Sequence, residues 1–368
     1  MDSSELDRWH MQRALELAAR GEGRVEPNPM VGCVVADGAE IIGEGWHRRF
    51  GGPHAEIEAL RLAGPRARGA TMYVTLEPCC HQGKTPPCTE AIIRAGISRV
   101  VAAQLDPFVE VAGKGVARLR AAGIDVQVGV LEGRARSLNA PYLKLLRTGR
   151  PWVIAKWAMT LDGKIAARTG SSHWVSGEPS RRIVHQLRGR VDAIMVGRVT
   201  AERDDPLLTA RPPGPRTALR IVADSLASLS STSRLVQTAR QVPVLVAVGP
   251  DAPERSRGRL EAAGCEVLVC DAPEPGGRLE QLLDQLGRRQ LTNLLVEGGG
   301  RLLGSLLDLG QIDEVHVFLA PKLVGGAEAP TPAAGTGLET IADALHLGEL
   351  HYEPSGEDLH IWGRLSPV

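Results

Sequence analysis

One histidine, one glutamate and two cysteines in the first quarter of the 368-residue chain have the types and spacing for metal chemistry. His54 and Glu56 lie two positions apart, and Cys79 and Cys88 follow with eight residues between them. One imidazole and two thiolates suit zinc, and three protein ligands leave a fourth position open for water, whereas a structural zinc site normally has four protein ligands. Glu56 would lie near the metal without being its natural ligand.

This set of residues predicts the hydrolytic removal of an amino group. Zinc lowers the pKa of a bound water from about 16 towards about 7, so that hydroxide is available at neutral pH. Glu56 can take a proton from that water and return it to a leaving amine, as in the His-x-Glu…Pro-Cys…Cys pattern of zinc deaminases. Cys88 opens the helix-like run CTEAIIRAG, whose free amide groups would favour a thiolate.

Other interpretations of these residues stay open. Cys80 directly follows Cys79, and because adjacent residues rarely both face one metal, we expect that Cys80 is not a ligand. We expect the same of His47 and His81. The alternative is a closed structural site built from the four cysteines of the first quarter together with His81. That alternative would leave no position for a reacting water.

Composition excludes several classes of protein. Lys plus Arg and Asp plus Glu both total 43, and this balance argues against a protein that coats nucleic acid, which would carry a basic excess. Phe, Tyr and Trp make up only 3% of the chain, too few for stacking platforms along a single strand. No apolar run approaches the roughly 18 residues of a membrane span, and the N-terminus has no signal-peptide core, so we expect a cytoplasmic protein.

The first half alternates strands and helices. Residues 6–20 and 53–64 show helical spacing, and residues 30–46 predict two strands around the Asp37-Gly38 turn. Further strands are predicted over 70–78, 98–106 and 124–130, with helices over 89–96 and 113–123 between them. A boundary falls near 147–151, where a helical stretch meets the Gly/Pro stop TGRP. We therefore predict two α/β domains, 1–147 and 148–368.

The second half again alternates strands and helices but lacks Gly-x-Gly-x-x-Gly, so a standard dinucleotide-binding site is not indicated. Strand candidates lie over 151–159, 191–197, 219–225, 242–249, 265–270, 291–300 and 313–321. The strand LTNLLVE runs into GGGRLLGSLLDLG, where glycines allow close backbone approach and the helix N-terminus favours a phosphate. A tight strand–helix turn explains the same pattern.

Three segments resemble the deaminase domain of the bifunctional riboflavin-biosynthesis deaminase/reductase family: PNPMVG, GGPHAEIEAL and YVTLEPCCHQGKTPPC. The long gap between the two cysteines holds the His-x-Gly-x-Thr-Pro-Pro loop typical of this family, although Cys80 stands where the family commonly has Ser. The resemblance implies a cytidine-deaminase-like three-layer domain. It also implies that His54, Cys79 and Cys88 bind zinc, that Glu56 shuttles the proton, and that Asn28 helps hold the pyrimidine.

The second half resembles the reductase domain of the same family, whose fold is similar to dihydrofolate reductase. The matching segments are KWAMTLDGKIA, GSSHWVSG, LRGRVDAIMVG, TAERDDPLLTAR and RIVADS, in the expected order. The resemblance implies substrate contacts from Lys156, Ser172, Arg188, Leu208, Arg211 and Glu297. It implies NADPH contacts from Ala158, Trp174, Thr200, Asp204, Ser225 and the loop Gly299, Gly300, Arg301, Leu302, Leu303, Gly304 and Ser305. We expect Arg188 and Arg211 to offer forked donors to the substrate phosphate.

The resemblance implies two consecutive reactions on one small molecule. The first is zinc-dependent deamination of 2,5-diamino-6-(5-phosphoribosylamino)pyrimidin-4(3H)-one, and the second is NADPH-dependent reduction of the ribosyl group to ribityl. Family members also lead us to expect a homodimer or larger homo-oligomer. Two rivals remain: a nucleobase or tRNA-editing deaminase, which needs a basic surface and exposed aromatic residues, and a zinc-stabilised nucleotide sensor, which needs a closed metal site. A chain with only one active domain is a third possibility, but no quoted motif is disrupted.

Overall fold

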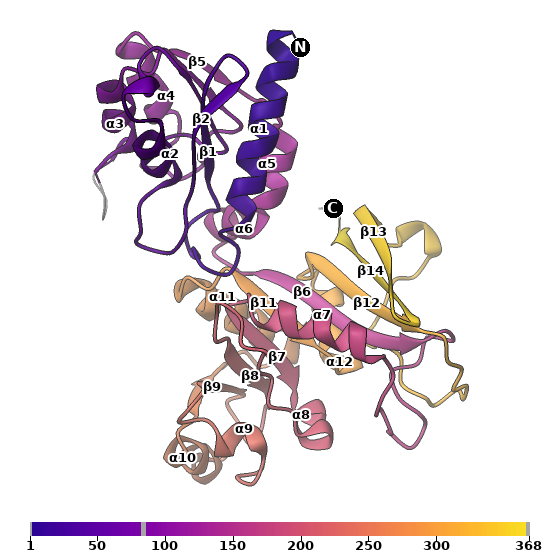
Figure 1. Ribbon diagram of the computed structural model, residues 1–368. Helices are drawn as coiled ribbons and strands as arrows, with labels where there is room; N and C mark the ends of the chain where they lie inside the picture. Colours follow the sequence, from indigo (N-terminus) through magenta and orange to yellow (C-terminus); the bar gives the residue numbers. More distant parts are fainter. Residues whose placement is uncertain (1, 82–85, 366–368) are drawn as a thin grey trace. The chain divides into compact units, whose positions relative to one another are not determined.

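The computed structural model describes residues 2–81 and 86–365, which divide into two compact units, Met1–Thr148 and Gly149–Val368 (Figure 1). Each unit has its own sheet and its own buried core. Residues 82–85 of the expected His-x-Gly-x-Thr-Pro-Pro loop lie outside the described residues. No helix in the described ranges is long and apolar enough to cross a membrane.

A five-stranded sheet in the order β2-β1-β3-β4-β5 forms the centre of the first unit. Its strands are β1 (Gly32–Asp37), β2 (Glu40–Trp46), β3 (Thr71–Val74), β4 (Arg99–Ala102) and β5 (Asp125–Val128). β1 pairs antiparallel with β2 through the predicted hairpin, where Gly38 has a φ of 58°. β3, β4 and β5 are parallel, so their carboxyl ends meet at one edge of the sheet.

Helices cover both faces of this sheet and complete three layers (Figure 1). The helices are α1 (Ser3–Ala19), α2 (Ala55–Ala63), α3 (Cys88–Ala95), α4 (Lys114–Ala121), α5 (Glu132–Leu138) and α6 (Ala140–Thr148), with a short 3₁₀ turn at Gly64–Ala67. Side chains of α1 and α5 share one cluster with the sheet. Those of α2, α3 and α4 share the other, which is built almost entirely from Ala, Val, Ile and Leu.

The second unit is built on a nine-stranded sheet in the order β10-β9-β8-β7-β11-β6-β12-β14-β13. Its strands are β6 (Trp152–Thr160), β7 (Ala193–Gly197), β8 (Leu219–Ala223), β9 (Val244–Val248), β10 (Glu266–Val269), β11 (Asn293–Glu297), β12 (Glu314–Ala320), β13 (Leu347–Ser355) and β14 (Asp358–Leu365). Strands β6 to β12 pair parallel, and the final hairpin adds two antiparallel strands at the edge.

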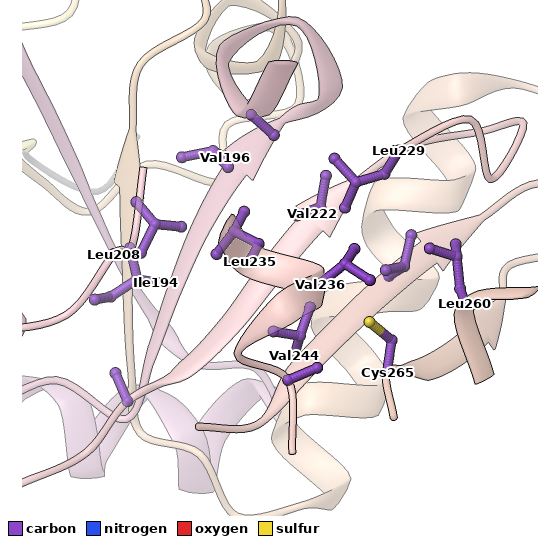
Figure 2. Packing of buried hydrophobic residues seen from close by; sticks show 14 of the residues in the cluster. Ile194, Val196, Leu208, Val222, Leu229, Leu235, Val236, Val244, Leu260 and Cys265 are labelled. Carbon is purple, nitrogen blue, oxygen red and sulfur yellow. The ribbon is translucent and has the colours of Figure 1, made fainter. Parts of the chain in front are cut away.

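Helices also cover both faces of the second sheet. They are α7 (Glu178–Arg188), α8 (Arg198–Asp204), α9 (Arg234–Gln237), α10 (Glu254–Ala262), α11 (Pro275–Arg288) and α12 (Gly300–Asp308), followed by a 3₁₀ turn at Ile341–Asp343. Figure 2 shows the core under α9 and α10, where Leu235 and Leu260 lie among strand residues such as Val222 and Val244. Leucines of α11 and α12 pack on the opposite face.

Some details differ from the sequence predictions. The strand expected over 70–78 ends at Val74, because the chain leaves the sheet there and turns towards Cys79. The helix α5 and the hairpin β13–β14 were not predicted, since neither segment carries a long periodic apolar pattern. Cys265 and Cys270, at the two ends of the strand predicted over 265–270, are buried but flank the four-residue strand β10 instead of lying in it.

A buried ion pair ties α1 to the first sheet. The Arg99 guanidinium donates to both Asp7 carboxylate oxygens at 2.7 Å, and the Tyr73 hydroxyl donates to one of them at 2.9 Å. Burial alone would raise the pKa of Asp7, but these hydrogen bonds and the Arg99 charge together lower it below its usual range. The charged carboxylate therefore stabilises the folded state above about pH 4, and that contribution is lost as pH falls through the lowered pKa.

We expect Asp7→Asn to reduce the free energy of unfolding of the first unit by about 1–3 kcal/mol at pH 7, since it replaces the buried charged acceptor of the Arg99 and Tyr73 hydrogen bonds with a neutral amide. Thermal unfolding of the full chain at pH 7 and pH 3 measures this effect. The difference between variant and parent shrinks at pH 3, where the parent has begun to lose the same contribution. An equal difference at both pH values would contradict this account.

Candidate metal centre and cationic cleft

Two helix N-termini and one strand end bring His54, Cys79 and Cys88 together. His54 is the N-cap of α2, Cys79 follows β3, and Cys88 is the first residue of α3. The α2 helix reaches this place because it packs directly on β2: a Cβ at Gly45 would lie 2.2 Å from the Ala55 carbonyl oxygen. The glycine therefore allows the approach that sets the position of His54.

The three donor atoms lie within 4.8 Å of one another, and the part of the chain that the structure describes contains no second group of this kind. His54 Nδ1 is 3.2 Å from Cys88 Sγ and 3.6 Å from Cys79 Sγ. Tetrahedral zinc with bonds of about 2.0 Å to nitrogen and 2.3 Å to sulfur separates its ligand atoms by about 3.6 Å. The donor set and its spacing therefore fit zinc, with a fourth position left open.

Electrostatics favour an anionic sulfur at Cys79. Hydrogen bonds from the Cys88 thiol and from His54 lower the pKa of Cys79 to about 4, and the hydrogen bond to Cys79 raises the pKa of His54 to about 9. The first amide of α3, Cys88 N–H, donates to Cys79 Sγ at 3.3 Å. The sequence predicts that the helix N-terminus favours a Cys88 thiolate, but the Cys88 amide points at Cys79, because Cys79 packs against the start of the helix.

Glu56 lies beside the donor group in the first turn of α2 and is only 3% exposed. Burial raises the pKa of its carboxyl group, while the charge of His54 and a hydrogen bond with Cys88 oppose that rise. A carboxyl group whose pKa is raised holds a proton more readily, so it can accept a proton and return it in a later step. Glu56 thus lies near the three donors without being one of them, as the sequence pattern predicts.

Cys80, His81 and His47 are not part of the donor group. Cys80 Sγ points away, 3.8 Å from the Glu110 carbonyl oxygen. His81 Nε2 lies 3.8 Å from a Glu110 carboxylate oxygen. The described residues thus show three donors at this place, and not the closed set of four cysteines with His81.

His47 and Asn28 form a hydrogen-bonded link next to the donor group. The His47 ring lies 5.6 Å from the His54 ring, and its Nδ1 atom is 3.0 Å from the Pro53 carbonyl oxygen. Its Nε2 atom is 3.3 Å from Asn28 Nδ2. Burial lowers the pKa of His47. Asn28 is therefore linked to the metal-binding residue His54 through His47.

The second unit has a cleft of about 510 Å³ lined by β6, α7, α8 and the loop after β11. Its lining contains six cationic side chains, Lys156, Arg181, Arg188, Arg203, Arg211 and Arg234, against two carboxylates, Asp204 and Glu297. An excess of positive charge in a concave site attracts anions such as phosphate groups. The cleft therefore suits ligands that carry phosphate.

A buried charge network occupies the centre of this cleft. Parallel pairing places Lys156 of β6 beside Glu297 at the end of β11. Arg188 Nε and Nη2 donate to the two Glu297 oxygens at 2.5 and 2.8 Å, and Lys156 Nζ lies 3.8 Å away. Burial opposes the Glu297 charge, but Arg188 and Lys156 lower the pKa of Glu297 to about 2. The forked donors of Arg188, expected to meet a phosphate, are thus paired with Glu297, whereas Arg211 is exposed.

The structure brings most of the predicted reductase residues to the cleft. Its lining includes Lys156, Ala158, Ser172, Trp174, Arg188, Thr200, Asp204, Leu208, Arg211, Glu297, Gly299, Gly300 and Leu303. Ser172 Oγ donates to Asp204 Oδ1 at 3.3 Å. The lining does not include Ser225, Arg301, Leu302, Gly304 or Ser305.

Sequence reasoning missed several residues of the cleft. Arg181 and His185 line it together with Arg188 and come from the same face of α7. Their spacing of four and three positions is the helical period, which could have identified them. Arg203 and Arg234 carried no comparable signal, because they come from different helices whose packing the sequence does not reveal.

Comparison with known proteins settles the family. Residues 4–104 match the cytidine and deoxycytidylate deaminase zinc-binding region, and residues 151–361 match the RibD C-terminal domain. The riboflavin biosynthesis protein RibD of Actinobacillus pleuropneumoniae is 42% identical, with 97% of this chain and 94% of that protein covered. The riboflavin biosynthesis protein RibD of Escherichia coli is also 42% identical, with 97% of this chain and 99% of that protein covered.

The chain belongs to the RibD family. Solved structures agree: RibD of Acinetobacter baumannii is 35% identical with a TM-score of 0.87, covering 99% of this chain and 100% of that one. A Thermotoga maritima structure titled diaminohydroxyphosphoribosylaminopyrimidine deaminase/5-amino-6-(5-phosphoribosylamino)uracil reductase is 34% identical with a TM-score of 0.85, covering 99% of both chains. The chain is therefore a bifunctional deaminase/reductase of riboflavin biosynthesis, with a cytidine-deaminase-like domain followed by a reductase domain of the dihydrofolate-reductase type.

Family membership confirms the fold class and the two activities expected from the sequence. The first domain contains a zinc-binding region, and the reductase domain fits a nicotinamide cofactor. The chain acts on a small molecule, which excludes the sensor and the tRNA-editing enzyme as its main function.

Replacing each of the adjacent cysteines separately distinguishes the metal ligand from its neighbour. We expect Cys79→Ser to lose most of the bound zinc, because a hydroxyl replaces a thiolate ligand, and Cys80→Ser to retain about one zinc per chain. Metal analysis of the two purified full-length variants gives the answer. A stoichiometric loss of zinc from Cys80→Ser would show that the sulfur turns into the site.

Proposed function

We propose that residues 1–147 deaminate 2,5-diamino-6-(5-phosphoribosylamino)pyrimidin-4(3H)-one and that residues 148–368 reduce the ribosyl group of the product with NADPH. The observation that carries the first step is the group of one imidazole and two cysteine sulfurs with a buried carboxyl group beside it. The observation that carries the second is the phosphate-attracting cleft with its central Glu297 network. We also propose that the chain forms a homodimer or larger homo-oligomer.

In the first step, His54, Cys79 and Cys88 hold the metal, and Asn28 helps to hold the pyrimidine. Zinc bound there would polarise a water molecule for attack on the amino-bearing ring carbon. Glu56 accepts a proton from the attacking water and returns it to the departing amino group, so that ammonia leaves and a ring carbonyl remains. Burial of Glu56 supports this role, because it brings the acid and base forms of the carboxyl group closer in energy.

In the second step, the chain positions two anionic ligands in one cleft. NADPH supplies the hydride that converts the ribosyl group into ribityl. For the substrate, we propose contacts from Lys156, Ser172, Arg188, Leu208, Arg211 and Glu297. For the cofactor, we propose contacts from Ala158, Trp174, Thr200, Asp204, Ser225 and residues 299–305. The exposed Arg211 guanidinium is the best candidate for the substrate phosphate, since Arg188 is already paired with Glu297.

Exchange of the buried carboxyl group for an amide tests the deaminase assignment. We expect Glu56→Gln to lower the rate of ammonia release by at least about 100-fold, because proton transfer at the reacting water is lost, while zinc remains bound. Ammonia release and metal content are measured on the same preparation. Reduction of the deaminated substrate with NADPH is the internal control and stays unchanged. Loss of zinc from this variant would show that Glu56 acts as a ligand.

A further inference from the structure

Asn139 makes a paired contact with one residue that lies 109 positions earlier in the chain. Its side chain is 1% exposed and lies at the end of α5. Its Oδ1 atom accepts from Met30 N–H at 2.8 Å, and its Nδ2 atom donates to the Met30 carbonyl oxygen at 2.9 Å. Both backbone groups of Met30 are thus bound by one rigid carboxamide, which fixes the main chain there.

Met30 belongs to the loop 27–31, which contains Asn28 and leads into β1. The same loop is held at two further points: Asn28 N–H donates to the Val25 carbonyl oxygen, and His47 N–H donates to the Val31 carbonyl oxygen, both at 2.9 Å. Asn139, which contacts Met30, lies near the C-terminal end of the first unit, whereas the loop lies near its N-terminal end. It therefore couples the Asn28 loop to the junction of α5 and α6.

The hydrogen bonds of His47 determine which way the Asn28 carboxamide faces. A carbonyl oxygen can only accept, so His47 Nδ1 carries the proton in its contact with Pro53. Asn28 Nδ2 lies 3.3 Å from His47 Nε2, so the Asn28 carboxamide turns its NH₂ group towards the ring. The Asn28 oxygen consequently faces away from the histidine. Because His47 binds the carbonyl of Pro53, the residue before His54, the orientation of the Asn28 carboxamide is fixed relative to a metal-binding residue.

We propose that Asn139 is a positioning residue for deamination: by fixing Met30, it places the Asn28 carboxamide so that its oxygen accepts a hydrogen bond from an N–H group of the pyrimidine. This inference rests on the proposed function, because it requires Asn28 to contact the substrate. Asn139 itself lies behind the loop and touches Met30, and it acts only through the position of Asn28.

A double-mutant cycle with Asn28→Ala, Asn139→Ala and the combined variant tests the proposal in the full-length, zinc-loaded protein. We expect Asn139→Ala to lower kcat/KM for ammonia release by about tenfold or more, with the same division between KM and kcat as Asn28→Ala. The combined variant should be no worse than Asn28→Ala alone, since the two residues act through one contact. Zinc content and NADPH-dependent reduction of the deaminated substrate stay unchanged.

Two further variants separate positioning from stability. Asn139→Asp keeps the size and the acceptor for Met30 N–H but turns an oxygen towards the Met30 carbonyl, so it should impair deamination at least as much as Asn139→Ala. Tyr73→Phe removes a buried hydrogen bond elsewhere in the same unit and should lower the unfolding temperature without changing kcat/KM.

The outcomes distinguish the substrate contact of Asn28 from the positioning role of Asn139. If Asn28→Ala leaves deamination unchanged, the proposed substrate contact of Asn28 is wrong. If Asn28→Ala impairs deamination but the Asn139 variants do not, or if the two effects add in full, Asn139 does not act through Asn28. Loss of zinc from the Asn139 variants in proportion to activity would equally overturn the positioning role.

Discussion

The meeting of two cysteine sulfurs and one imidazole at the end of β3 is the constraint on which the first unit depends. Two thiolates so close together repel each other unless a cation lies between them, so metal binding and the local fold stabilise each other. The elements that carry the donors are held by contacts that tolerate little change, above all the approach of α2 to β2 at Gly45. Glu56 is buried beside the donors because it lies in the first turn of that helix.

In the second unit, the corresponding constraint is the charge balance around the buried Glu297 carboxylate. Glu297 is buried between Arg188 and Lys156, and a single carboxylate there would be costly without both cations. The remaining arginines of the cleft lie around this balanced centre and give it an excess of positive charge. The cleft around this centre therefore suits anionic ligands.

Short local patterns were sufficient to predict much of this structure. The turn at Asp37-Gly38, the helix that begins after His54 and the strand that runs into Gly298 to Gly300 each have a recognisable residue signal, and the structure confirms them. The pairing of Arg188 with Glu297 and the contact of Asn139 with Met30 join residues 109 positions apart in the chain. No local pattern encodes such contacts, because only the packing of distant elements creates them.

The most direct measurement follows both products when the zinc-loaded protein is given the diaminopyrimidine ribotide. Without NADPH, we expect release of one ammonia per substrate and no further reaction. Addition of NADPH should then cause an equal loss of its absorbance as the ribosyl group is reduced. Absence of ammonia release, or ammonia release with no later NADPH consumption, would contradict two consecutive reactions on one substrate.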